Sequence, residues 1–151
     1  MKLAEALILR ADCQKKIAQI NDRLSKNALI QDGETPSEKP EDLLNELDST
    51  LIELQNLIKS INKTNSIVEF ETNKTLADAL AERDILVLEI RAIQALLNSS
   101  KVVINRYSQS EIKYKSTINI ANTQKKLDDL SKKHRILDTK IQELNWKYDL
   151  I

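Results

Sequence analysis

Apolar residues recur at spacings of three and four along most of the chain, and residues that break helices are nearly absent from these stretches. The only glycine, Gly33, and both prolines fall within residues 33–40. Because such spacing places apolar side chains on one helix face, and glycine and proline are poor helix formers, the pattern predicts long helices. We expect the first helix over about residues 2–27 and the second over about residues 40–62, with an acidic loop between them.

The second predicted helix has the most regular stripe of apolar residues. Their successive spacings are three, four, three, four and three, at Leu44, Leu47, Leu51, Leu54, Ile58 and Ile61. Leu43 and Leu57 make this stripe wider than the seam of a two-stranded coiled coil. A wider apolar face is typical of a helix in a multi-helix bundle.

Two segments outside the first two helices have β character. Residues 66–73 are rich in β-forming residues and end in turn residues, which predicts a short strand. Residues 111–120 alternate apolar and polar side chains, and this period of two predicts a half-buried strand that, with residues 102–104, suits a small hairpin. Helices are expected over about residues 76–98 and 119–148.

These elements predict the fold class and the domain organisation. We expect one domain, residues 1–151, with an all-α fold: an antiparallel four-helix bundle with long helices and short β-like connections, one small hairpin among them. Apolar residues make up 41% of the chain and charged residues 30%, which suits a folded protein rather than a disordered one. Aromatic residues are only 3%, so the core is expected to consist mainly of Leu, Ile and Ala.

The third predicted helix is apolar on nearly all sides. Between Ile85 and Leu97 the only polar residues are Glu89, Arg91 and Gln94. A helix of this kind is expected to be buried against neighbouring elements on more than one side. We therefore predict a homo-oligomer whose interface lies on this helix, with a lipid-contacting surface as the alternative. The predicted interface residues are Leu86, Ile90, Ile93 and Leu97.

Charge is balanced overall but unevenly distributed. The net charge is zero, which removes the simplest argument for nucleic acid as a partner. Residues 31–48 hold seven acids and one base, whereas residues 101–135 hold nine bases and three acids. We interpret these stretches as solvated faces that attract each other within or between subunits. The alternative is a basic surface for anionic lipid or RNA.

The chain has too few cysteine, histidine and glycine residues for most catalytic and metal sites. Cys13 is the only cysteine and His134 the only histidine, which excludes a zinc site of cysteine and histidine and a bundle-type di-metal site. A single glycine cannot form a glycine-rich phosphate loop. His134 lies between Leu130 and Leu137, where a polar residue can set helix register. We expect no enzyme activity, no metal and no cofactor.

One cluster of polar residues resembles a binding site. It gathers a guanidinium, a phenol, two hydroxyls and a carboxylate in a connection predicted to be non-helical, where binding groups are frequent. Its members are Arg106, Tyr107, Ser108, Ser110 and Glu111. The competing interpretation is that these side chains hydrogen-bond the exposed backbone of their own connection.

The chain resembles a small bacterial family described as septicolysin-like, or simply as a domain of unknown function. Five stretches carry this resemblance, in order along nearly the whole chain: residues 1–7, 61–65, 75–84, 106–114 and 137–146. The family label implies a pore-forming, cytolytic toxin and supplies no catalytic residues.

Three hypotheses about function follow. The leading one is a non-enzymatic oligomeric bundle with an unidentified protein partner, in the cytoplasm, because Glu5 interrupts the first apolar run and no stretch is long enough to span a membrane. The second is a membrane-active, toxin-like protein that exposes the third helix to lipid. The third is a ligand site within residues 106–111.

Overall fold

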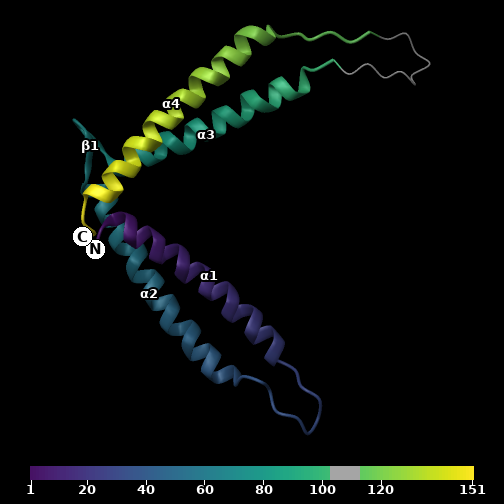
Figure 1. The fold of residues 1–151 in the computed structure, drawn as a ribbon, viewed down its shortest axis with the longest axis vertical. Coiled ribbons are helices and arrows are strands. Elements are labelled where there is room, and N and C mark those ends of the chain that lie inside the picture. Colours follow the sequence, from purple (N-terminus) through teal and green to yellow (C-terminus); the bar gives the residue numbers. More distant parts are fainter. Residues whose placement is uncertain (103–112) are drawn as a thin grey trace. The chain divides into compact units, whose positions relative to one another are not determined.

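The computed structural model describes residues 1–102 and 113–151. Within these residues the chain forms four helices and one two-stranded antiparallel sheet (Figure 1), which confirms the all-α prediction. The elements are α1 (Leu3–Asn27), α2 (Pro40–Ile67), β1 (Glu69–Glu71), β2 (Lys74–Thr75), α3 (Leu76–Ser99) and α4 (Ile120–Lys147).

The second helix is longer than its sequence pattern predicts. α2 continues to Ile67 rather than ending near Asn62. In this extension the Thr64 hydroxyl donates to the Ser60 carbonyl oxygen at 2.8 Å, and Thr64 is fully buried. Burial in the tertiary structure therefore outweighs the weak helix propensity of these residues.

The predicted strand within residues 66–73 is present but starts later. β1 pairs with β2, with Glu69 opposite Thr75. Asn73 in the turn has a φ of 61°, a left-handed conformation that asparagine tolerates better than most residues. Val68 and Phe70 are buried, and the Leu76 N–H donates to the Val68 carbonyl at 2.8 Å, which connects the sheet to the start of α3.

The second predicted strand is wrong where the structure describes it. Residues 113–119 form no strand, and residues 103–112 lie outside the described residues. An alternating stretch forms a stable strand only with neighbouring strands and a packed face. Here the segment instead leads into α4, where the Asn119 side chain accepts a hydrogen bond from the Asn122 N–H at 3.0 Å and caps the helix.

The described residues group into two compact units. The first unit comprises Met1–Ala77 with Gln142–Ile151, and the second comprises Asp78–Ile141. The expectation of a single domain stays a prediction.

In the first unit, α1 and α2 pack antiparallel around a small core. Its fully or nearly fully buried apolar side chains come from both helices and from the sheet: Leu3, Ala6, Cys13, Ile20, Leu43, Leu57, Ile61, Val68, Phe70 and Leu76. The two ends of the chain pair next to this core (Figure 1). The Leu3 N–H donates to the Tyr148 carbonyl at 3.0 Å, and the Ile151 N–H donates to the Thr64 hydroxyl at 2.9 Å.

In the second unit, α3 and α4 form an antiparallel pair. Ion pairs join Glu82 to Lys133 at 3.6 Å and Glu89 to Lys126 at 3.4 Å. The Arg83 guanidinium forms an ion pair with the Asp138 carboxylate at 3.4 Å. Among the described residues of this unit, the buried apolar ones are Leu86, Leu97, Leu127, Leu137 and Ile141, together with Ala79.

Candidate interaction surface on the first helical hairpin

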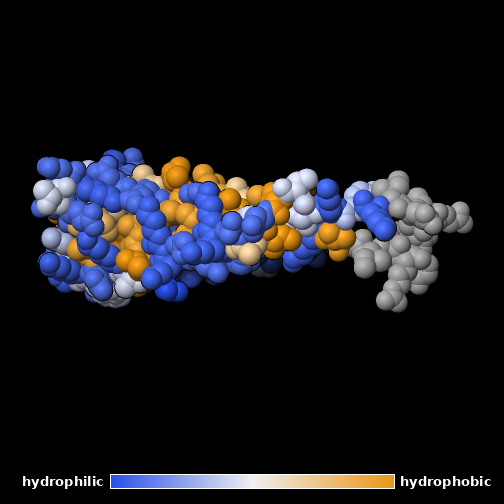
Figure 2. Space-filling view, turned by 90° about the horizontal axis from the view of Figure 1, so that it is seen from above, coloured by the Kyte–Doolittle hydropathy of each residue, from blue (hydrophilic) through white to orange (hydrophobic). Residues whose placement is uncertain are grey.

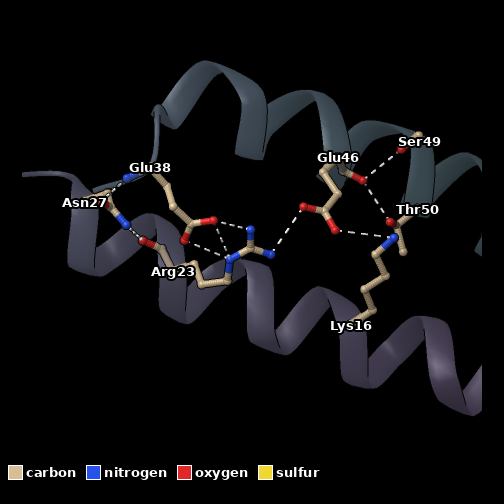
Figure 3. A network of polar contacts seen from close by, with 7 residues as sticks. All are labelled: Lys16, Arg23, Asn27, Glu38, Glu46, Ser49 and Thr50. Atoms are coloured by element: carbon tan, nitrogen blue, oxygen red, sulfur yellow. Dashed lines mark hydrogen bonds and ion pairs between the residues drawn. The ribbon is translucent and has the colours of Figure 1, made fainter. Parts of the chain in front are cut away.

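A network of charged side chains fixes α1 against the beginning of α2 (Figure 3). The Arg23 guanidinium on α1 donates to both carboxylate oxygens of Glu38, and its Nη1 donates to the Glu46 carboxylate at 3.2 Å. Lys16 lies 3.4 Å from the other Glu46 oxygen. Asn27 adds a contact to the loop, because its side-chain oxygen accepts the Glu38 N–H at 3.0 Å. The network sets the register of the two helices.

The same contacts perturb the ionisation of the pair. Hydrogen bonds from Arg23 lower the pKa of the Glu38 carboxyl below its ordinary value, and those to Glu38 raise the pKa of Arg23. Both shifts favour the charged forms. Sequence reasoning placed Glu38 only within an acidic loop. The signal that it missed is an arginine on the apolar side of the first helix, three residues after Ile20.

α2 carries two neighbouring lines of residues at heptad spacing. Those that face α1 and the core are Leu43, Thr50, Leu57 and Thr64, all buried. Three members of the stripe predicted from the sequence each follow one of these buried residues and are exposed: Leu44 by 49%, Leu51 by 43% and Ile58 by 38%. Its other members are covered, since Leu47 and Leu54 are half-buried and Ile61 is buried. One residue is a rotation of about 100° on a helix, so the second line points away from the core.

The two threonines of this line are buried with their hydroxyls hydrogen-bonded. The Thr50 hydroxyl donates to the Glu46 carbonyl oxygen at 2.8 Å, and Thr64 bonds Ser60 in the same way. A hydroxyl that is satisfied within its own helix can be buried without an unpaired polar group. The apolar face predicted from the sequence includes Leu43 and Leu57 of this buried line but not Thr50 and Thr64.

Charged residues border the exposed line, which we call the α2 stripe: Leu44, Leu51 and Ile58. Glu41 and Asp48 lie towards its start, and Lys59 lies just after its end. All three are exposed. Within residues 1–102 and 113–151, no ion pair or hydrogen bond engages their side chains.

The predicted interface on the third helix is largely covered by the chain itself. Leu86 and Leu97 are each only 5% exposed. Ile90 and Ile93 are half-buried. The exposed apolar residues of α3 are instead Ile85, Leu88 and Leu96. Figure 2 shows one face of the molecule, on which apolar surface lies exposed between polar side chains. The homo-oligomer and its interface on these four residues stay predictions.

The predicted binding cluster of Arg106, Tyr107, Ser108, Ser110 and Glu111 lies outside the described residues and stays a prediction. Described residues on either side of it line a cavity of about 510 Å³, with Lys101 and Lys115 and no acid among them. Both lysines are exposed.

The two residues with the strongest potential for chemistry occupy structural positions. Cys13 is buried in the first unit, and burial raises the pKa of its thiol, which keeps it protonated. His134 is half-buried on α4. In the part of the chain that the structure describes, no three His, Cys, Asp or Glu side chains gather closely enough to hold a metal ion.

A membrane-spanning helix must be long and predominantly apolar. None of the described helices is both long enough and apolar enough to cross a bilayer.

Comparisons with known proteins identify relatives but no activity. The family whose sequence model matches is described as a family of unknown function (DUF6847), and the match covers residues 10–150. A crystal structure of a functionally unknown conserved protein from Corynebacterium diphtheriae has 39% sequence identity and a TM-score of 0.95, over 100% of this chain and 99% of that one. No curated protein matches the chain. Nothing in these comparisons shows a septicolysin link.

Proposed function

The chain belongs to the family of unknown function DUF6847, and from this premise we propose that it is a non-enzymatic, self-associating helical-bundle protein of the cytoplasm. Self-association would bury the apolar helix surface that a single copy leaves exposed. The free, buried thiol of Cys13 suits a reducing compartment.

The α2 stripe is the observation that carries this proposal. Single exposed leucines are common on protein surfaces and need no explanation. Here three large apolar residues repeat every seven positions along one well-formed helix, at Leu44, Leu51 and Ile58. At about 1.5 Å per residue, the stripe extends roughly 21 Å. Heptad repetition is the pattern by which helices of different subunits pack.

Sedimentation equilibrium over a range of protein concentrations tests the proposal. The chain has a mass of 17.3 kDa, and we expect a larger mass that falls towards this value on dilution. A mass that stays at that of one chain throughout a dilution series into the high micromolar range would refute self-association.

The second candidate function is membrane activity, as the septicolysin-like resemblance implies. The exposed Ile85, Leu88 and Leu96 of α3 favour it, because apolar side chains on a helix can enter a lipid surface. Dye release from anionic and neutral liposomes separates the two functions. Release at substoichiometric protein would support the toxin-like function, and its dependence on Leu88→Asp would locate it on α3.

A further inference from the structure

We propose that the α2 stripe binds the α2 stripe of a second copy of this chain, with the two helices antiparallel about a two-fold axis beside Leu51. This inference rests on the proposed function and specifies its interface. Two observations favour a second copy of the chain on this exposed face: the symmetry of the stripe and the distribution of charge along its edge.

The stripe is symmetric about its central residue. Leu44 and Ile58 each lie seven residues from Leu51 in opposite directions. In an antiparallel pair, Leu44 therefore lies at the level of Ile58 of the partner subunit, and the two Leu51 side chains meet at the axis. Leu47 and Leu54 are half-buried between the stripe and the core and add apolar surface along the same side. Two-fold pairing of identical patches is the commonest form of homo-oligomer.

The charges along the stripe favour the antiparallel orientation. Lys59 lies eight residues after Leu51, so Lys59 of the partner subunit falls at the level of residue 43. That level lies between Glu41 and Asp48, which are exposed and bound to no described side chain. The two-fold axis creates this contact twice. A parallel two-fold pair would place these charges on opposite sides of the interface, where Lys59 meets neither carboxylate of the partner subunit, so only the antiparallel pair gains the contact.

Disulfide linking tests the orientation directly. Each variant carries one new cysteine, and the wild type, whose Cys13 is buried, is the control. We expect Leu51→Cys to form a linked dimer under mild oxidation. Leu44→Cys and Ile58→Cys should link poorly alone, because like positions would lie about 21 Å apart along the axis. A mixture of these two variants should yield the mixed dimer. Efficient linking of Leu44→Cys to itself would overturn the antiparallel arrangement.

A charge-reversal series provides a second measurement that does not depend on cysteine chemistry. Lys59→Glu changes an exposed residue, so the fold should be retained, as circular dichroism can verify. It should raise the dissociation constant by about twofold to thirtyfold at low salt, because two surface ion pairs are lost. Adding Asp48→Lys should restore part of the affinity. An unchanged dissociation constant in Lys59→Glu would contradict the charge argument.

The outcomes separate this inference from the function on which it rests. If the wild type is a monomer at all concentrations, the proposed function fails. If the wild type associates but only Leu88→Cys on α3 links, self-association holds and the α2 interface is wrong. If the α2 variants link in the expected pattern, both hold.

Discussion

Truncation of Leu51 to alanine should weaken self-association more than the same truncation outside the α2 stripe. Complete burial of a leucine side chain stabilises by about 1.5–3 kcal/mol. Leu51 is 43% exposed, so covering that part contributes about 0.6–1.3 kcal/mol per copy. The symmetric pair contains this residue twice, which doubles the contribution to about 1.3–2.6 kcal/mol. Since about 1.4 kcal/mol corresponds to a factor of ten, the dissociation constant should rise roughly tenfold to seventyfold.

The assay is sedimentation equilibrium on wild type, Leu51→Ala and a matched control. Leu29→Ala is the control because it makes the same truncation at a residue that is 90% exposed and lies in the loop before α2. The covered part of Leu51 also contributes to folding, so urea titration should show a loss of about 1 kcal/mol without unfolding. Equal dissociation constants for Leu51→Ala and Leu29→Ala would refute the interface.

Three further changes test the first unit. Ile20→Ala empties a fully buried site and should lower the free energy of unfolding by about 2–5 kcal/mol in urea; a loss as small as that of an exposed residue would contradict the core assignment. Thr64→Val removes the acceptor of the Ile151 N–H and should lower the free energy of unfolding by about 1–3 kcal/mol. An unchanged urea midpoint would show that this hydrogen bond does not contribute to stability. Arg23→Gln should destabilise at neutral pH, and its difference from wild type should shrink as pH falls below about 4.5. There Glu38, whose pKa the fold lowers, takes up a proton and the contribution of the pair is lost. A difference that is constant down to about pH 3 would exclude this pairing.

Local pattern predicted the helices well because helix formation depends on near neighbours. The bounds of α1, α3 and α4 agree with the spacing of apolar residues and the position of breakers. The prediction was wrong where a distant contact decides the local structure. α2 continues past Asn62 because Thr64 is buried against the chain ends, and its hydroxyl receives the Ile151 N–H across 87 residues of sequence. The alternating residues 113–119 failed as a strand for the opposite reason, because no neighbouring strand accompanies them in the described structure.

The candidate surface was predicted only in part. The sequence led to self-association through the apolar third helix, yet Leu86 and Leu97 are buried within the chain. These two residues are buried inside their own unit, and a count of apolar residues cannot distinguish burial within one chain from burial against a second subunit. The α2 stripe was recognised as apolar, but it was taken for the face that packs inside the bundle.

By itself the sequence determined that α2 is a helix with a broad apolar side, since spacing and propensity are properties of one segment. Only the tertiary structure decided which line of that side is covered. α1, held in register by Arg23 and its two carboxylates, packs over the line that contains Thr50 and leaves Leu51 exposed. The two lines differ by one residue, and a helix can turn either towards its neighbour with little change in its own hydrogen bonds. Packing against α1 of the same chain selects which line is buried, and the other line becomes the exposed stripe.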